Sequence, residues 1–112
     1  MAYRDPREPF IRLTTVEAKR ILENGGAQLV DVRETWEYQN GHIPDSEHIP
    51  VNVVFPRRSE LNADRDIIFV CSVGQRSALA CEMAAAAGLT RLYNLEGGTE
   101  AWVKEGFPFV KK

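Results

Sequence analysis

The sequence predicts an α/β domain with a mostly parallel β-sheet. Three observations lead to this fold class: short apolar runs that suit buried strands, helical patterns between those runs, and glycines where the helical patterns stop. A short, bounded apolar run is typical of a strand in a parallel sheet that is covered on both faces. Strands that alternate with helices favour parallel pairing, because each parallel connection crosses over through a helix.

Length and composition set the limits of the prediction. The chain has 112 residues, 44% of them hydrophobic and 27% charged, which is typical of one globular domain. The formal net charge is -2, and the basic pairs Arg57-Arg58 and Lys111-Lys112 stand alone. We therefore expect no nucleic-acid partner. No apolar run approaches membrane-spanning length, so we expect no membrane partner.

The first half of the chain opens with a polar segment and continues with strand–helix pairs. Residues 1–9 contain two prolines and mixed charges, which predict a flexible lead-in to a domain over residues 10–112. Thr14 and Glu17 have the spacing of a capping box, which starts a helix. We expect, in order, a strand over 10–13, a helix from Thr14 to the Asn-Gly-Gly stop at 24–26, a strand over 28–32, a short helix over 34–40 and a brief strand over 47–50.

The second half contains the clearest strand and the clearest helix. Residues 66–70 predict a buried strand, and the Ala-rich residues 77–87 predict a helix with Ser77 as its N-cap and Gly88 as its stop. Residues 51–65 predict a loop with one helical turn. A strand over 91–95, a turn at Gly97-Gly98 and a last helix over 99–105 complete the order.

Cys71 lies where the strand over 66–70 ends and a helix is about to begin. The carboxyl ends of strands in an open α/β sheet are where ligands bind, and a helix N-terminus favours a thiolate. The loop over 72–77 can curl so that its N–H groups point inward, with Gly74 accepting a positive φ and Arg76 adding a permanent charge. We interpret Cys71 as a nucleophile; the alternative is a structural cysteine before an ordinary turn.

Four separated motifs stand out across residues 10–110. They are Leu29-Val30-Asp31-Val32-Arg33-Glu34 with Trp36-Glu37-Tyr38, Gly41-His42-Ile43-Pro44 through His48-Ile49-Pro50, Cys71-Ser72-Val73-Gly74-Gln75-Arg76-Ser77, and Leu95-Glu96-Gly97-Gly98 with Ala101-Trp102. These motifs resemble the signatures of the rhodanese-type sulfurtransferases, and they occur in the family's order. We therefore identify the chain as a member of the single-domain rhodanese-like sulfurtransferases. The resemblance implies a three-layer α/β/α fold around a mostly parallel sheet of about five strands.

The resemblance implies a two-step sulfur transfer that needs no cofactor. Cys71 would take the outer sulfur of a donor such as thiosulfate and become a persulfide, and a small thiol, cyanide or a protein thiolate would remove that sulfur. The implied site has Cys71 as the catalytic residue, and the rest of its loop binds substrate: Ser72, Val73, Gly74, Gln75, Arg76 and Ser77.

Two other functions remain as alternatives. The first is a binding or regulatory module that keeps the fold and does little catalysis. The second is a phosphatase or arsenate reductase, which the loop length disfavours: four residues separate Cys71 from Arg76, one fewer than in those relatives of the fold. Ser72 and Val73 stand where thiosulfate-preferring relatives often carry basic residues, so the physiological donor stays open. Asp45 stands where relatives often have glycine, and we expect it to alter a turn.

Asp31 and Arg33 point to the same side of their strand, because they flank Val32. The resemblance implies that Asp31 organises the active-site region and that Arg33 contacts an anion or a structural carboxylate. An internal ion pair is the preferred interpretation for both.

The remaining histidines and cysteine have simpler interpretations. We expect His42 and His48 to be structural, because a thiolate nucleophile needs no base, and we expect no metal site. Cys81 is expected to pack as a small apolar group rather than to act as a resolving thiol.

The expected compartment is the cytoplasm, and a monomer is favoured. The two cysteines lack the spacing of a disulfide framework or a zinc site, and residues 1–6 lack an apolar signal core. A free thiolate persists in a reducing compartment.

Overall fold

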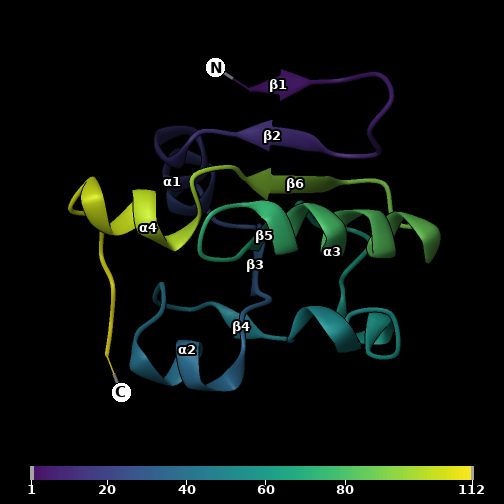
Figure 1. The fold of residues 1–112 in the computed structure, drawn as a ribbon. Helices are drawn as coiled ribbons and strands as arrows, with labels where there is room; N and C mark the ends of the chain where they lie inside the picture. The colour runs from purple at the N-terminus through teal and green to yellow at the C-terminus, as the bar shows by residue number, and fades with distance from the viewer. Residues whose placement is uncertain (1, 112) are drawn as a thin grey trace.

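The computed structural model describes residues 2–111, so Met1 and Lys112, the outer ends of the predicted lead-in and domain, lie outside the described residues. Figure 1 shows helices on both sides of one central sheet. The elements are β1 (Tyr3–Arg4), β2 (Ile11–Leu13), α1 (Thr15–Glu23), β3 (Gln28–Asp31), α2 (Thr35–Asn40), β4 (Glu47–His48), the 3-10 helices η1 (Val51–Val53) and η2 (Arg58–Glu60), β5 (Ile67–Val70), α3 (Gln75–Ala86), β6 (Leu92–Leu95) and α4 (Gly98–Lys104).

The sheet has six strands in the order β1-β2-β6-β5-β3-β4, and every pairing except β1–β2 is parallel. The predicted α/β fold with a mostly parallel sheet is therefore confirmed. The expected number of strands was about five; the sixth is β1, which lies within the predicted lead-in. Its two residues carry no strand pattern of their own, and their structure comes from antiparallel pairing with Ile11 and Arg12.

β5 lies at the centre of the core. All four of its residues are buried, and they alternate between two clusters. Phe69 and the following Cys71 belong to the cluster under α3, whereas Ile68 and Val70 belong to the cluster under α1 and α4. Fully burying a side chain of this size stabilises a fold by about 1.5–3 kcal/mol, so β5 is held firmly from both faces. Its carboxyl end is accordingly a rigid support for the residue that follows.

The helix starts agree with the sequence in one case and differ in another. α1 begins with the predicted capping box, because the Glu17 N–H donates to Thr14 Oγ1 at 3.2 Å and the Thr14 N–H donates to Glu17 Oε1 at 2.8 Å. α3 begins at Gln75, so the prediction of Ser77 as its N-cap is wrong. The cap residue is Gly74 in the left-handed conformation, and the Ser77 side chain is buried inside the first turn.

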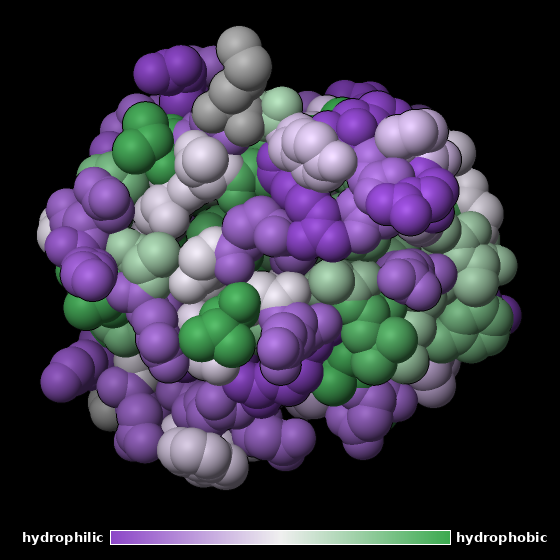
Figure 2. Space-filling view, turned by 45° about the horizontal axis from the view of Figure 1, so that its top comes forward, coloured by the Kyte–Doolittle hydropathy of each residue, from purple (hydrophilic) through white to green (hydrophobic). Residues whose placement is uncertain are grey.

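No helix among residues 2–111 has the length and hydropathy needed to cross a membrane. On the face shown in Figure 2, hydrophobic side chains lie in separate groups among hydrophilic ones.

Candidate active site

Cys71 directly follows β5, and its side chain has no solvent exposure. Its Sγ lies 3.1 Å from the N–H nitrogen of Gly74 and 3.4 Å from that of Ser77, and both groups donate to it. The Ser77 hydroxyl oxygen is also 3.4 Å from Sγ. The loop therefore folds around the sulfur, as the sequence predicted.

Two opposing effects determine the pKa of Cys71. Burial, the largest single effect, raises the pKa of the thiol. Hydrogen bonds from the Ser77 hydroxyl and from the N–H groups of Ser77, Val73 and Gly74 lower it, and together they outweigh burial. The pKa of Cys71 consequently lies below the ordinary value of a cysteine, so the loop favours a thiolate.

Two glycines allow the backbone to approach closely enough to form this loop. Gly74 has a φ of 95°, and a Cβ there would lie 2.3 Å from the carbonyl oxygen of Glu96. Gly98 has a φ of 64°, and a Cβ there would lie 2.2 Å from the carbonyl oxygen of Ser72. The sequence predicted Gly98 only as part of a turn; the structure shows that it brings α4 against the cysteine loop.

The N-terminus of α4 binds the carbonyls of the cysteine loop. The Thr99 N–H donates to the carbonyl of Cys71 at 2.8 Å, and the Glu100 N–H donates to the carbonyl of Ser72 at 3.2 Å. Because these carbonyls are directed to α4, the N–H groups farther along the loop are free to face the sulfur. α4 thus orients the donors without touching the thiol.

Arg76 forms an ion pair instead of pointing at the sulfur. Its guanidinium donates to both carboxylate oxygens of Glu37 on α2, at 2.7 and 3.0 Å, and to the Ser72 hydroxyl at 3.0 Å. The hydrogen bond with Arg76 holds the pKa of Glu37 below its usual range. Sequence reasoning missed Glu37 as a partner of the loop. Binding of an anion by Arg76 stays a prediction, and it requires sharing the guanidinium with Glu37.

Asp31 and Arg33 form a buried ion pair at the end of β3, next to β5. Both Asp31 oxygens accept from the Arg33 guanidinium, at 2.7–3.1 Å, and Arg33 also donates to the carbonyl of Gly41 at 2.7 Å. Asp31 pairs in register with Val70, one residue before Cys71. The pair therefore fastens the strand next to the site; contact of Arg33 with a bound anion stays a prediction.

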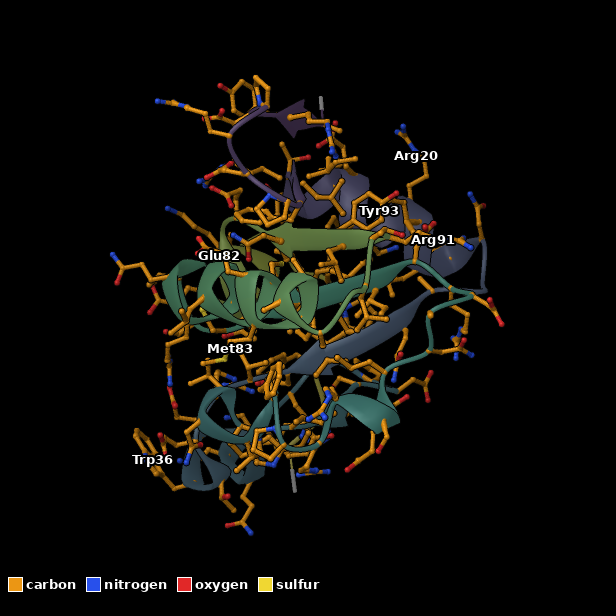
Figure 3. The ribbon with its side chains drawn as sticks, turned by 90° about the vertical axis from the view of Figure 1, so that its right-hand side faces the viewer. Arg20, Trp36, Glu82, Met83, Arg91 and Tyr93 are labelled. Atoms are coloured by element: carbon orange, nitrogen blue, oxygen red, sulfur yellow. The ribbon has the colours of Figure 1, made fainter. Side chains whose placement is uncertain are left out.

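The other loop side chains differ in exposure. Val73 and Gln75 are exposed and Ser72 is half-buried. Trp36, next to Glu37 on α2, is 65% exposed, and Figure 3 shows it at the periphery of the molecule. Contact of these side chains with a donor or an acceptor stays a prediction.

Asn94 is a buried polar residue of the site that the sequence analysis did not single out. It lies in β6, accepts a hydrogen bond from the Ser77 hydroxyl and donates to the carbonyl of Gly74 at 3.1 Å. The signal that could have revealed it is a single amide in the middle of an otherwise apolar strand.

The histidines and Cys81 take part in packing. Tyr38 stacks between His42 and His48, with ring centroids 3.8 and 4.5 Å apart, and each histidine contacts a backbone carbonyl. Cys81 is fully buried, and burial raises the pKa of its thiol well above the ordinary value. Residues 2–111 contain no group of three or more potential metal ligands.

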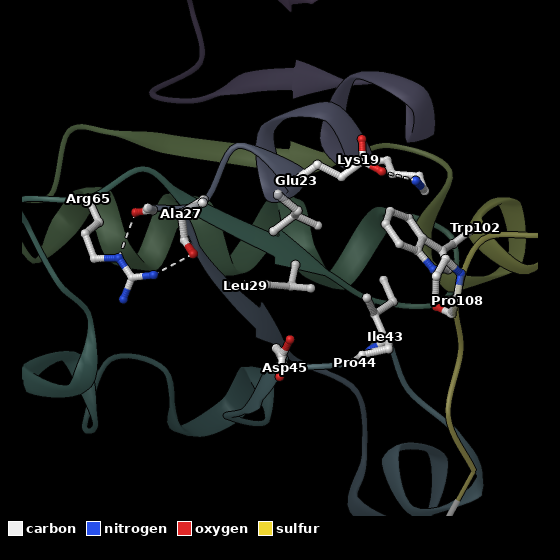
Figure 4. Close-up of a pocket in the computed structure, with 13 residues that line it drawn as sticks. Lys19, Glu23, Ala27, Leu29, Ile43, Pro44, Asp45, Arg65, Trp102 and Pro108 are labelled. Carbon is white, nitrogen blue, oxygen red and sulfur yellow. Dashed lines mark hydrogen bonds and ion pairs between the residues drawn. The ribbon is translucent and has the colours of Figure 1, made fainter.

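A cavity of about 420 Å³ lies away from the cysteine loop (Figure 4). Leu29, Ile43 and Trp102 line it, and these residues belong to the core cluster on the α1 and α4 side of the sheet. Cys71 belongs to the cluster on the α3 side. The cavity is therefore separate from the thiol chemistry.

The fold and this loop define a class of protein in which a parallel sheet presents a thiolate at the start of a helix. The model of the Rhodanese-like domain matches residues 14–105. A protein named "Sulfurtransferase" from Allochromatium vinosum is 37% identical over 93 residues, which cover 83% of this chain and 87% of that protein. A thiosulfate sulfurtransferase, GlpE, from Pseudomonas paraeruginosa is 34% identical over 95 residues, 85% of this chain and 86% of its own.

Solved structures agree with the sequence comparisons. The crystal structure of a rhodanese-related protein from Thermoplasma volcanium superposes with a TM-score of 0.81 at 29% identity, covering 90% of this chain and 98% of that one. The chain therefore belongs to the rhodanese-like domain family, as the four motifs predicted, and its relatives include sulfurtransferases.

We predict that Gly98→Ala destabilises the protein more than Gly88→Ala does. Both glycines have a positive φ, but a Cβ at Gly88 meets nothing within 4 Å, whereas one at Gly98 collides with the backbone of Ser72 and Cys71. The free energy of unfolding should fall by about 1 kcal/mol for Gly88→Ala and by about 2 kcal/mol or more for Gly98→Ala. Denaturant titration measures both, and equal losses would contradict the close approach of α4.

We predict a pH-dependent contribution of the Glu37–Arg76 pair to stability. The pKa of Glu37 is lowered in the folded state, so its ionised form stabilises the fold above the ordinary pKa, and this contribution is lost as the pH falls through the lowered value. Arg76 is partly exposed, so Glu37→Gln should cost only about 1 kcal/mol near pH 7. The cost should shrink towards about pH 3, well below the ordinary pKa of glutamate.

Urea unfolding of both proteins at the two pH values tests this prediction. Glu60→Gln, which breaks an exposed pair with Arg57, is the matched control and should change little at either pH. A cost for Glu37→Gln that does not vary with pH would contradict the assignment.

Proposed function

We propose that the protein is a sulfurtransferase that carries sulfane sulfur on Cys71, from a donor such as thiosulfate to a thiophilic acceptor. The observation that carries this proposal is the environment of the Cys71 sulfur: two N–H groups donate to it at 3.1 and 3.4 Å, and the pKa of the thiol is lowered. Membership of the rhodanese-like family and the names of the relatives support the same chemistry.

The first step forms one S–S bond and breaks another. The Cys71 thiolate attacks the outer sulfur of thiosulfate, and the bond between the two donor sulfurs breaks with its electron pair leaving on sulfite. Cys71 is then a persulfide anion, whose charge lies on the outer sulfur. In the second step an acceptor, such as cyanide or a thiolate, attacks that outer sulfur and releases the Cys71 thiolate. Splitting the transfer in two lets one group receive and deliver the sulfur.

The loop suits an anion on a single sulfur atom. N–H groups that already point at the sulfur stabilise negative charge there without reorganising. Four residues separate Cys71 from Arg76, so the loop is shorter than expected for a tetrahedral oxyanion, which supports sulfur transfer over phosphate chemistry. Cys71 has no solvent exposure, so we expect groups at the loop to move aside when a donor reaches its sulfur.

Thiosulfate is proposed as one donor rather than the sole donor. Ser72 and Val73 carry no charge, and Arg76 is paired with Glu37. Attraction of a dianion therefore rests mainly on the backbone N–H groups and on the N-terminus of α3. A sulfur donor with less negative charge than thiosulfate would therefore lose little affinity for this loop. We also propose that the protein acts in the cytoplasm, where a reducing environment preserves the thiolate. We further propose that it acts as a monomer.

Sulfur loading tests the proposal directly. After incubation with thiosulfate, intact mass should increase by one sulfur atom, and cyanide should then release thiocyanate. Cys71→Ser should lose both signals, because serine keeps the size of the side chain but offers no thiolate. Absence of a persulfide with both thiosulfate and mercaptopyruvate would favour a binding module, and release of phosphate from an aryl phosphate would favour a phosphatase.

We predict that Cys81→Ala retains most of the turnover. Its thiol is buried, and burial together with nearby carboxylates raises its pKa, so it is a poor nucleophile. The measurement is thiocyanate release alongside circular dichroism. A large loss of turnover in a folded Cys81→Ala protein would show that Cys81 acts as a resolving thiol.

A further inference from the structure

The Ser77 hydroxyl has two neighbours that compete for its one proton. Cys71 Sγ lies 3.4 Å from the hydroxyl oxygen, and Asn94 Oδ1 accepts its hydrogen bond on the other side. All three residues are fully buried, so water cannot replace either contact. A hydroxyl carries one O–H donor, so Ser77 cannot donate to both neighbours at once, although its oxygen can still accept a hydrogen bond.

The orientation of the Asn94 amide follows from its other partners. Its Nδ2 donates to the carbonyl of Gly74 at 3.1 Å and to the carboxylate of Glu96, and both partners are acceptors only. Glu96 is itself held by Arg12 at 2.6 Å. The nitrogen must therefore face these groups, which leaves Oδ1 facing Ser77 as an acceptor.

We infer that Asn94 is a positioning residue that controls Cys71 through the Ser77 hydroxyl. When Cys71 is a thiol, its S–H donates to Ser77 Oγ and the Ser77 hydroxyl donates to Asn94. When the thiol loses its proton to solvent, the hydroxyl turns to the thiolate, and the buried Oδ1 of Asn94 loses its donor. Ionisation of Cys71 thus costs one hydrogen bond at Asn94.

Asn94 therefore restrains the ionisation of Cys71, whereas the loop N–H groups favour it. This inference rests on the proposed role of Cys71 as the nucleophile. Once the persulfide forms, its charge moves to the outer sulfur and the hydroxyl can return to Asn94. Three ion pairs join charged side chains on the elements that surround the site: Arg76 on α3 with Glu37 on α2, Glu96 after β6 with Arg12 on β2, and Asp31 at the end of β3 with Arg33. Glu100 on α4 and Glu34 before α2 are the other charged side chains near the loop.

A double-mutant cycle separates this role from simple anchoring of the loop. Asn94→Leu removes the amide oxygen that competes with Cys71 for the Ser77 hydroxyl. It also removes the hydrogen bond from Asn94 to the Gly74 carbonyl, but that carbonyl still accepts from the Ala78 N–H. Ser77→Ala removes the hydroxyl. We compare the effect of Asn94→Leu in the Ser77 and the Ser77→Ala proteins, because loss of an anchor acts equally in both, whereas competition for the hydroxyl exists only with Ser77.

The readout is the pKa of Cys71, from the pH dependence of its alkylation by iodoacetamide in the Cys81→Ala background. We compare the change that Asn94→Leu causes in the acid ionisation constant of Cys71 in the two backgrounds. With Ser77 present, this constant should increase by about tenfold more than it does in Ser77→Ala, which lowers the pKa of Cys71 by about one further unit. Equal effects in the two backgrounds, or a shift towards the thiol, would overturn the inference. If Asn94→Leu does not fold, Asn94→Ala completes the same cycle with the same expected sign.

The measurement uses no sulfur donor, so it is independent of the sulfurtransferase assay. Loss of the proposed function would appear as no persulfide in the protein with Asn94 and Ser77 intact, whatever the alkylation profiles show. If both hold, the pH profile of sulfur loading in Asn94→Leu should move to lower pH together with the alkylation profile.

Discussion

The close approach of α4 to the loop after β5 is the constraint on which the site depends. Gly98 lacks the Cβ that would collide with the Ser72 carbonyl, so N–H groups in the first turn of α4 can donate hydrogen bonds to the carbonyls of the loop. With the carbonyls of Cys71 and Ser72 directed to α4, the following N–H groups turn to the sulfur. A buried thiol would otherwise have a raised pKa; here the inward donors reverse that effect.

The surrounding structure holds this loop from several sides. β5 is buried on both faces and supports the loop at its start, and Asp31 with Arg33 fastens the neighbouring strand. Arg76 links the loop to α2 through Glu37. Such links limit the movement of the N–H groups, and donors that are already oriented stabilise charge best. The contacts that stabilise the fold around the loop therefore also hold the N–H donors of the site in place.

Most of the fold could be predicted from the sequence, because it depends on local patterns. Apolar runs separated by helical patterns indicate a parallel sheet, and the Thr14–Glu17 box marks the start of α1. β1 and the start of α3 could not be predicted in this way. β1 exists through its pairing with β2, and Ser77 is drawn into the helix by buried partners rather than left at the cap.

The sequence by itself determined that a cysteine follows a buried strand, that Gly74 allows the loop to curl, and that four residues separate Cys71 from Arg76. These are properties of neighbouring residues. Only the tertiary structure decided which groups face one another: Arg76 meets Glu37 across 39 positions of sequence, and Ser77 meets Asn94 across 17. Such contacts depend on how helices and strands pack, and a local pattern of residues contains no record of that packing.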